Sequence, residues 1–437
     1  MAEICPFRGY TYNPSRVRFD DVVAPPYDKI ADPSVYHAKS PYSIVHVNLP
    51  GPERGQEVEE RYRAASELLS QWMAEGVLVR EKTMAIYAYH QLYTLGGKSY
   101  TRKGMVCLLR LEKPGGRRVQ FHEQTKSAPK LDRLLHLRSV RAHLGHVFLL
   151  YSDPEQKVEK ALAGNVEGPP RVQATLEGGV LHRLWAVTDR EAITAATHAL
   201  ADLPLTIADG HHRYETAWTY RSEVEEARGN IQYQGSAGFR MVTLVNTEQP
   251  ALHILATHRL VLSADVPDGG EILRRFSSLF SLRRYPYQGD IDRPRVWRDF
   301  LEDLRIEGTA GPCFGILRAG DREFLLLVPL DRAKIHGAVP GGTSSARREL
   351  DVTVLHEVVL PALLGEGAGA AELDYAREPE EAAAAVSSGR VRAAFLLNPT
   401  RLSQVHKVAD EGERMPPKST DFFPKLASGI VIHKLED

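Results

Sequence analysis

The chain has 437 residues, of which 43% are hydrophobic and 25% charged, values typical of globular proteins rather than disordered, fibrous or membrane-spanning ones. Its 55 Lys and Arg residues nearly balance its 56 Asp and Glu residues, so no overall positive charge favours binding to nucleic acid or to an anionic membrane. The three cysteines are far apart, and we find neither a signal peptide nor an apolar run long enough to span a bilayer, so we expect a cytoplasmic protein with two or three domains.

Residues 1–115 are predicted to form an N-terminal α+β region. Between Glu57 and Glu75, apolar residues recur every three or four positions, which predicts a helix with one buried face that ends at Gly76. Two predicted strands are joined across Gly96 and Gly97, because glycine permits the positive φ angles of a hairpin turn. The predicted strands of this region are Ser43–Leu49, Met84–Tyr93 and Gly104–Leu111.

Residues 116–234 alternate between predicted helices and strands, and residues 235–437 form a predicted C-terminal α+β domain. In the middle region the helices are Lys130–Leu144, Glu155–Ala163, Glu191–Leu200 and His212–Ala227, and the strands are Val147–Tyr151, Leu181–Val187 and Leu205–Ala208. In the C-terminal domain the strands are Phe239–Val245, Leu252–Leu255, Phe314–Leu317, Phe324–Val328, Ala393–Leu397 and Gly429–His433, and the helices are Glu271–Phe280, Val296–Leu304, Val354–Leu364 and Glu380–Val386. The pattern predicts a multi-domain α+β protein with mixed sheets.

A polar box between a predicted strand and a predicted helix is the strongest candidate for a binding site. Its members are Asp209, Gly210, His211, His212 and Arg213. The first turn of a helix offers unpaired backbone N–H groups to an anion, and the glycine lets the backbone approach a phosphate closely. The aspartate is suited to capping the helix or binding Mg²⁺, and the histidines and arginine supply donors that neutralise phosphate charge. The alternative is an aspartate N-cap followed by structural histidines.

A second polar cluster, residues 121–125, contains Glu123 and is followed by the cations Lys126, Lys130 and Arg133. A carboxylate beside a basic stretch is suited to accepting a proton from a substrate hydroxyl while the cations face phosphate. The alternative is a solvated helix start, since runs of charge usually face water.

Two further segments carry donors for phosphate. They present Lys418, Ser419 and Thr420 in the loop 414–425, and His258 and Arg259 after an apolar strand. Prolines stiffen the loop, but it is not a Walker loop because the glycines of that motif are absent. The alternatives are a surface turn for the loop and a structural role for the histidine.

Several common catalytic motifs are missing from the sequence. The pairs His122-Glu123 and His356-Glu357 each lack the second histidine of the helical zinc motif. Neither a Gly-x-Ser-x-Gly elbow nor a Gly-x-Gly-x-x-Gly fingerprint is present. These observations argue against zinc peptidases, α/β-hydrolase esterases and Rossmann-fold dehydrogenases.

Along nearly its whole length the chain resembles the family known as domain of unknown function 1015. The matching segments are Pro6–Gly9, Val23–Asp28, His122–Thr125, Asp132–Leu134, Ile207–Ala217, Thr257–Arg259, Leu350–Val352 and Met415–Thr420. The box is also similar to the phosphate-binding box of the ParB/sulfiredoxin superfamily, which includes nucleotide-binding partition proteins and free-serine kinases. This second resemblance implies a ParB/sulfiredoxin-like α/β core in the region 116–234, and it places the catalytic base of the serine kinases at Glu123.

We therefore expect a small-molecule kinase that transfers phosphate from ATP to a hydroxyl group of a free amino acid such as L-serine. Glu123 is the expected base, with His211 and His212 at the transferring phosphate and Asp209 as the Mg²⁺ ligand. The residues expected to bind the nucleotide are Asp209, Gly210, Arg213, Lys130, Arg133, His258, Arg259, Lys418, Ser419 and Thr420. Because no segment alone supplies enough cations, the segments 121–133, 208–215 and 414–425 are expected to meet in one cleft.

Two other functions fit the same residues: a nucleotide-binding ParB-like regulatory switch, and a phosphatase or phosphotransferase that acts on a phosphorylated metabolite. DNA binding is not expected, because the acidic stretch 223–229 follows the box where a partition protein carries a basic helix-turn-helix. No membrane partner is expected either.

Overall fold

The computed structural model describes residues 3–55, 57–116, 118–123, 127–229, 236–365 and 373–436. Its contacts divide the chain into two compact units. The first unit comprises Met1–Phe121, Thr125–His253 and Phe422–Asp437, and the second comprises His122–Gln124 and Ile254–Asp421. The three regions expected from the sequence, 1–115, 116–234 and 235–437, stay a prediction.

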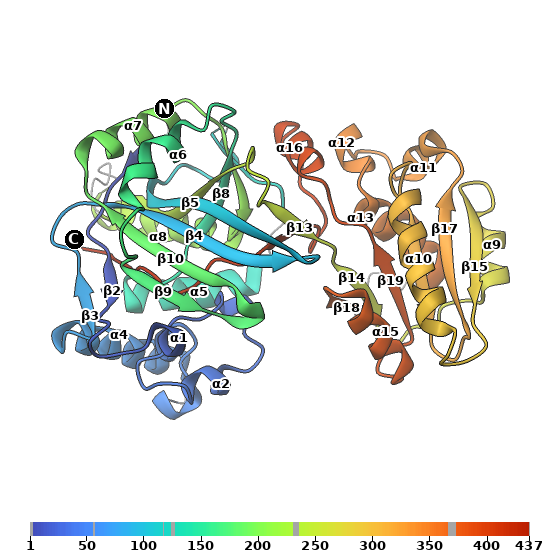
Figure 1. Cartoon of the computed structure of the whole chain (residues 1–437), viewed down its shortest axis with the longest axis horizontal. Coiled ribbons are helices and arrows are strands. Elements are labelled where there is room, and N and C mark those ends of the chain that lie inside the picture. Colours follow the sequence, from blue (N-terminus) through green and yellow to red (C-terminus); the bar gives the residue numbers. More distant parts are fainter. Residues whose placement is uncertain are drawn as a thin grey trace. The chain divides into compact units, whose positions relative to one another are not determined.

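The first unit is built on a nine-stranded mixed sheet (Figure 1). Its strand order is β6 (Val119–Gln120), β11 (Leu205–Asp209), β8 (Val147–Tyr151), β12 (Phe239–Asn246), β5 (Lys98–Arg110), β4 (Ile86–Leu95), β10 (Leu181–Val187) and β9 (Val172–Thr175), with β1 (Ile4–Cys5) also paired to β5. β6 runs parallel to β11 and β8 runs parallel to β12, whereas the other neighbours are antiparallel. The expected α+β fold with mixed sheets is confirmed.

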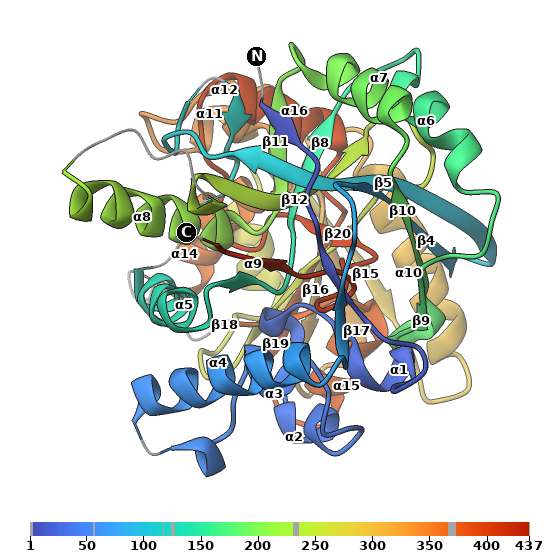
Figure 2. The ribbon, with the colours of Figure 1, turned by 90° about the vertical axis from the view of Figure 1, so that its left-hand side faces the viewer.

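The helices of the first unit pack in two groups. α6 (Lys157–Leu162), α7 (Arg190–Leu200) and α8 (His211–Ala227) contribute buried side chains to the same apolar core as the central strands. A second core lies beneath α4 (Val58–Ala74) and the short helices α1 (Phe19–Val22), α2 (Pro33–His37) and α3 (Val45–Asn48). α5 (Ser127–Val140) packs on both α4 and α8 and lies between them (Figure 2).

The longest predicted elements of the first unit are confirmed. The apolar face of α4 is buried at Tyr62, Ala65, Leu69 and Trp72, and the helix is followed by Gly76 at a φ of 72°. β4 and β5 meet at Gly96 and Gly97, whose φ angles of 55° and 76° are those of the predicted hairpin turn.

The predicted strand Ser43–Leu49 is wrong. Val45–Asn48 forms the helix α3, in which the N–H of Leu49 donates to the carbonyl of Val45 at 2.8 Å. Ile44, Val45 and Val47 are fully buried in the core under α4. A short apolar run that is buried on all sides has no periodicity that distinguishes a strand from a helix.

The last predicted strand, Gly429–His433, is also shorter in the structure. β21 spans only His433–Lys434 and pairs with β7 (Ala142–His143), and Ile432 forms an isolated bridge to Tyr10 beside the ladder of β2 (Tyr10–Tyr12) and β3 (Leu78–Arg80). Gly429, with a φ of 79°, interrupts the extended conformation.

The second unit is a six-stranded antiparallel sheet with helices on both faces (Figure 1). Its order is β15 (Phe280–Pro286), β17 (Glu323–Pro329), β16 (Phe314–Arg318), β19 (Ala393–Leu397), β14 (His258–Val261) and β18 (Leu373–Ala376). Neighbouring residues of β17 alternate between the two faces, so Leu325 and Leu327 join one core while Phe324 and Leu326 join the other.

Each face of this sheet has its own helices. One core contains side chains from α10 (Arg293–Glu307) and α15 (Pro379–Ser387). The other contains side chains from α9 (Gly269–Phe276), α11 (Arg332–Ala338), α12 (Ser345–Arg348), α13 (Asp351–Val354), a π-helical turn (Leu355–Val359), α14 (Leu360–Leu364) and α16 (Leu402–Asp410). The chain passes between the units near β13 (His253–Leu255) and β20 (Asp421–Phe423). Among the described residues, no helix combines the length and apolar character needed to cross a bilayer.

Candidate functional site

The polar box lies in the first unit, where β11 ends at Asp209 and α8 begins at His211. Gly210 occupies the N-cap position of α8 with a φ of 96°, a conformation that glycine adopts without a steric penalty. A Cβ atom at this position would lie 3.2 Å from the guanidinium of Arg213, which folds back over the glycine. The helix has no side-chain cap, so Asp209 is not the N-cap residue considered as an alternative.

Both carboxylate oxygens of Asp209 bind cations. One oxygen accepts from Lys425 Nζ at 3.0 Å, and the other lies 3.2 Å from Nη2 of Arg213. Burial alone would raise the pKa of Asp209, but the charges of Lys425 and Arg213 outweigh burial and hold the pKa well below its usual range. The carboxylate is therefore ionised at any physiological pH.

Arg213 is held in place from two sides. Its Nη2 pairs with Asp209, and its Nη1 donates to the backbone carbonyl of His146. Burial and the neighbouring Arg240 and Arg213 lower the pKa of His146 to about 3, so this imidazole is neutral and adds no charge to the cluster. The side chain of Arg213 is only 12% exposed, and Arg213 is one of the residues that line a cavity.

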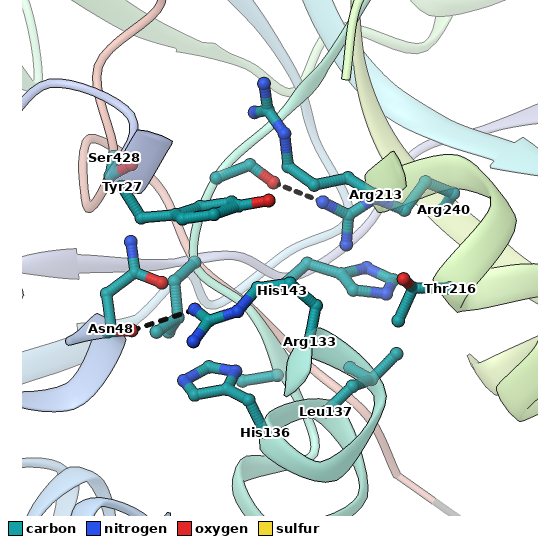
Figure 3. Close-up of a pocket in the computed structure, with 13 residues that line it drawn as sticks. Tyr27, Asn48, Arg133, His136, Leu137, His143, Arg213, Thr216, Arg240 and Ser428 are labelled. Carbon is teal, nitrogen blue, oxygen red and sulfur yellow. Dashed lines mark hydrogen bonds between the residues drawn. The ribbon is translucent and has the colours of Figure 1, made fainter. Parts of the chain in front are cut away.

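Three arginines, Arg133, Arg213 and Arg240, line this cavity, and the guanidinium of Arg213 is turned away from those of the other two (Figure 3). Its empty volume is about 480 Å³, part of which is open to solvent. The lining residues are Tyr27, Asn48, Arg133, His136, Leu137, Ala142, His143, Leu144, Gly145, Arg213, Thr216, Arg240 and Ser428, all of them in the first unit. We call it the three-arginine cavity. None of these lining residues carries a carboxylate.

The three arginines differ in their partners. Arg133 bonds the exposed carboxylate of Asp132 at 2.8 Å, and it donates to the backbone carbonyl of Asn48 at 3.0 Å. Arg240 donates to the carbonyl of Gly145 at 2.6 Å but forms no ion pair with any described carboxylate. Burial and the charge of Arg213 both lower the pKa of Arg240, so its surroundings among the described residues disfavour its charged form.

Neutral donors complete the lining. The buried Oγ1 of Thr216 has no hydrogen-bond partner among the described residues, and burial raises the pKa of Tyr27, so its hydroxyl stays protonated. Burial and Arg133 lower the pKa of His136 to about 3, and burial holds the pKa of His143 well below its usual range. The cavity therefore combines an excess of positive charge with neutral hydroxyl and imidazole groups, an arrangement suited to an anion.

Of the polar box, Arg213 alone is among the residues that line the cavity. His211 is buried against Phe121, with ring centroids 5.6 Å apart, and His212 is half-buried, which lowers its pKa. Lys130, predicted to bind the nucleotide, forms an ion pair with Glu215 on α8. Of the cations predicted in this unit, the structure thus brings Arg133 and Arg213 together at one cavity.

His122 and Glu123 of the second polar cluster contact the loop that carries Lys418, Ser419 and Thr420. Glu123 accepts the N–H of Lys418 at 3.2 Å, and the N–H of Met415 donates to the carbonyl of His122 at 2.7 Å. His122 also lies 3.2 Å from Oγ1 of Thr420, and Ser419 donates its hydroxyl hydrogen to the carbonyl of Pro416. Gln124, Thr125 and Lys126 lie outside the described residues.

Arg259 and His258 are buried beside this loop. Arg259 donates to the carbonyl of Lys418 at 3.0 Å and to that of Pro417 at 3.3 Å, and its Nε lies 3.1 Å from His356 Nε2. His258 accepts the N–H of Leu397 at 3.2 Å. Arg259 therefore holds the backbone of the loop that carries Lys418. The roles predicted for these second-unit residues in phosphate binding stay predictions.

Three residues of the cavity lining, namely Tyr27, Thr216 and Arg240, were not among the site residues predicted from the sequence. Arg240 has a signal in retrospect, because it is the single charge within the apolar strand Phe239–Asn246, and a buried charge in a strand needs a partner. Tyr27 belongs to the segment Val23–Asp28 that carried the family resemblance. Thr216 likewise belongs to the segment Ile207–Ala217 that carried the resemblance, although its residue type alone gave no reason to place it at a site.

Several solved structures are similar to this chain, all at low sequence identity. A free serine kinase variant in complex with AMP is 13% identical with a TM-score of 0.34, and the match covers 70% of this chain and 83% of that chain. SbnI with a C-terminal truncation from Staphylococcus aureus is 11% identical with a TM-score of 0.34, covering 73% and 84%. A conserved hypothetical protein from Pyrococcus furiosus is 13% identical with a TM-score of 0.32, covering 71% and 90%.

No curated protein matches the sequence. A protein family does: the family described as "Protein of unknown function (DUF1015)" matches residues 4–353, which include the polar box and all but one of the residues that line the three-arginine cavity. The resemblance expected from the sequence motifs is confirmed, and the chain belongs to the DUF1015 family.

Proposed function

We propose that this chain is a phosphotransferase that binds the phosphate groups of a nucleotide in the three-arginine cavity and transfers one phosphoryl group to a hydroxyl of a small metabolite. The observation that carries the proposal is that three arginines line one cavity, and that one of them, Arg240, forms no ion pair with a carboxylate among the described residues. Guanidinium forks match the spacing of phosphate oxygens, and a bound phosphate would supply the missing negative charge.

The proposed donor is ATP, and the first acceptor to test is a free amino acid with a hydroxyl group, such as L-serine. Phosphoryl transfer depends chiefly on positioning and on stabilising charge at the phosphate. Arg133, Arg213 and Arg240 supply that charge in the first unit. Glu123 is the proposed base for the acceptor hydroxyl, and Lys418 is proposed to offset charge that develops during the transfer.

Asp209 does not fit the role of a magnesium ligand. Both of its oxygens already accept from cations, Lys425 and Arg213, and a metal ion would have to displace them. We therefore assign Asp209 to the orientation of Arg213 and derive no step that involves a metal.

The test has two parts. Calorimetry measures the binding of AMP, ADP and ATP to the purified full chain, and mass spectrometry searches for a phosphorylated product after incubation with ATP, Mg²⁺ and a pool of amino acids and metabolites. Binding together with a new phosphorylated product supports the proposal. Failure of all three nucleotides to bind at millimolar concentration overturns it.

A nucleotide-binding regulatory switch is the second candidate, and one observation favours it. None of the residues that line the three-arginine cavity carries a carboxylate, so the cavity itself contains no acidic general base. Binding of a nucleotide without any product would identify the switch. Release of phosphate from a pool of phosphorylated metabolites without added nucleotide would instead indicate the phosphatase alternative.

A further inference from the structure

A second cavity of the first unit lies between its sheet and the helix α6. Its lining comes from β4, β5 and β8, from α6, and from Ala163 and Val166, which follow that helix. The empty volume is about 670 Å³, part of it open to solvent, and small-molecule sites usually measure about 300–1,000 Å³. We call it the α6 cavity. It shares no lining residue with the three-arginine cavity and contains no residue of the polar box.

The α6 cavity and the polar box lie at opposite ends of a pair of antiparallel strands. The box begins at the last residue of β11, Asp209, whereas the α6 cavity contains the last residue of β8, Tyr151. Because β8 and β11 are antiparallel neighbours, their last residues point to opposite ends of the strand pair. A ligand in the α6 cavity would therefore bind apart from the residues of the box.

The wall of the α6 cavity is mostly apolar. It is made of side chains that belong to, or pack against, the core between the sheet and its helices, namely Met105, Tyr151, Val158, Leu162 and Val166. Protein interiors are close-packed, so a hollow beside the core leaves apolar surface that an apolar group of a ligand would cover. The wall therefore favours a ligand with an apolar body.

On the helix side of the α6 cavity, the half-buried Glu159 contributes a carboxylate. It accepts from the hydroxyl of Tyr151 at 3.3 Å and from Nδ2 of Asn246 at 3.5 Å, both longer than the usual hydrogen bonds of about 2.7–3.0 Å. Burial and the charge of Glu159 raise the pKa of Tyr151 above its usual range, so this hydroxyl keeps its proton. No cation among the described residues pairs with Glu159, and a carboxylate removed from water favours a positive partner.

On the sheet side, Lys103 of β5 contributes an ammonium group. Its backbone is fixed by Gln249, which accepts the N–H at 2.8 Å and donates to the carbonyl at 3.0 Å, and no carboxylate among the described residues pairs with its side chain. His90 lies opposite Lys103 in the ladder of β4 and β5, and burial and the charges of Lys103 and Arg183 lower its pKa to about 4. The imidazole is therefore neutral at physiological pH, and Lys103 supplies the positive charge of the lining.

We propose that the α6 cavity binds an α-amino acid with an apolar side chain. Glu159 pairs with the ammonium group of this ligand and Lys103 with its carboxylate, while its side chain covers the apolar wall. The lining contains one carboxylate and one ammonium group that do not pair with each other, and a zwitterion supplies a partner to both. The proposal goes beyond the proposed phosphotransferase, because it assigns a second class of ligand to a cavity without the three arginines.

The experiment titrates L-leucine and L-phenylalanine into the full chain and measures the heat of binding. We expect at least one of them to bind with one molecule per chain. Isoamylamine and phenethylamine lack the carboxylates of these amino acids, and isocaproate and hydrocinnamate lack their ammonium groups. Each analogue should bind about tenfold more weakly or worse than its parent, as expected for the loss of a charge-assisted contact. Glycine, which has no side chain to cover the apolar wall, should also bind more weakly.

Substitutions of the two charged residues test the assignment directly. Glu159→Gln and Lys103→Met should each weaken binding of the amino acid by about tenfold or more. Their matched controls are Glu155→Gln, in the exposed segment before α6, and Lys98→Met, at the exposed start of β5, and both should leave the affinity unchanged.

Three results would overturn the proposal. They are failure of both amino acids to bind at millimolar concentration, equal affinity in Glu159→Gln and Glu155→Gln, and equal affinity of an amino acid and either of its analogues. Arg240→Met should leave amino-acid binding unchanged, and a parallel loss in this variant would place the ligand in the three-arginine cavity instead. Because Lys103 is exposed, its substitution keeps the test valid even if Glu159→Gln folds poorly.

Discussion

Arg240 carries a charge that no carboxylate of the described residues pairs with. Its only described hydrogen bond goes to a neutral backbone carbonyl, that of Gly145, and the charge of another arginine, Arg213, lowers its pKa. Such a group costs stability in the free protein and gains energy when an anion binds. The charge of Arg240 therefore favours anion binding but lowers the stability of the free protein.

Replacing Arg240 with methionine should separate these two effects. Because an unbalanced buried charge is removed, we expect Arg240→Met to leave the free energy of unfolding unchanged or to raise it by about 1–2 kcal/mol. Nucleotide affinity should fall by about 10- to 100-fold, the value of a charge-assisted hydrogen bond. Calorimetry and urea denaturation measure the two quantities.

Lys98→Met, the same change at an exposed strand position, is the control for Arg240→Met and should alter neither quantity. An Arg240 variant that binds nucleotide normally would remove this residue from the site.

Substitution of Asp209 is expected to lower stability, in contrast to Arg240→Met, because two cations balance the charge of Asp209. Asp209→Asn leaves Lys425 and Arg213 without their carboxylate, and we expect a loss of about 2–4 kcal/mol in the free energy of unfolding. The exposed Asp202→Asn is the control and should change stability by less than about 0.5 kcal/mol.

The pH dependence of stability should show the contribution of the Asp209 carboxylate. The pKa of Asp209 is lowered in the folded state, so its stabilising contribution is fully present above the unfolded value of about 3.9 and is lost as the pH falls below it. Between about pH 4 and pH 2 the unmodified chain should lose stability more steeply than Asp209→Asn. Equal slopes in acid denaturation curves would contradict the ion-pair assignment.

At the residue scale, the sequence predicted the box but not its whole surroundings. Residue types alone indicated Arg213 and Arg133, which do line one cavity, because clustered cations near a helix start are visible in the sequence. Arg240 comes from another element, β12, and only the sheet topology brings β12 beside β8 and thereby close to the box. Sequence motifs did not indicate that Arg213 is bonded to Asp209 and to the backbone.

At the element scale, the junction between β11 and α8 depends on one glycine. Gly210→Ala places a side chain at a φ of 96° and within 3.2 Å of the Arg213 guanidinium. We expect a loss of about 1–2 kcal/mol in the free energy of unfolding, the cost of a left-handed conformation for an L-residue, and a weaker nucleotide affinity because Arg213 must move.

Gly164→Ala is the control for this junction, because a Cβ atom there meets no other atom and the φ angle is ordinary. The free energy of unfolding, measured by denaturation, and the nucleotide affinity, measured by calorimetry, should both be lower in Gly210→Ala than in Gly164→Ala. Equal behaviour of both would show that the junction tolerates a side chain.

Elements with strong periodicity or clear turn residues were predictable from the sequence. The helix α4 and the hairpin of β4 and β5 fall where the three-to-four spacing and Gly96-Gly97 place them. The segment Ser43–Leu49 was mistaken for a strand, and strands such as β14 were missed, because short buried runs take their conformation from the core around them.

At the scale of the whole molecule, the residues proposed for nucleotide binding and for the general base belong to different units. The three-arginine cavity belongs to the first unit and the candidate base Glu123 to the second. We expect Glu123→Gln to keep nucleotide affinity but to lower turnover by about 100-fold or more, the usual contribution of a general base. Steady-state rates and calorimetry measure the two quantities. An unchanged rate would remove Glu123 from the mechanism without affecting the cavity.

The first unit is completed by residues that follow the second unit in sequence. The segment Phe422–Asp437 buries six large apolar side chains, namely Phe422, Leu426, Ile430, Val431, Ile432 and Leu435. At about 2 kcal/mol for each buried side chain, their loss is on the order of 10 kcal/mol, comparable with the whole stability of a typical domain.

A chain that ends at residue 421 should therefore lack a folded first unit. We expect it to lose near-ultraviolet circular dichroism and nucleotide binding, and we expect a synthetic peptide of residues 422–437 to restore both in part. Cooperative unfolding of the shortened chain with intact nucleotide binding would show that the segment is dispensable.

This connectivity also sets an order for folding during protein synthesis. The ribosome delivers Asp209 and Arg213 long before Lys425, and the segment Ile254–Asp421, which makes up nearly all of the second unit, is made in the interval. The second unit is able to fold while the first waits for its final segment, and domains fold as units once their residues are available. A product released early would carry the polar box without the lysine and the apolar segment that complete its surroundings, so prematurely terminated chains should not compete with the finished protein for its ligand.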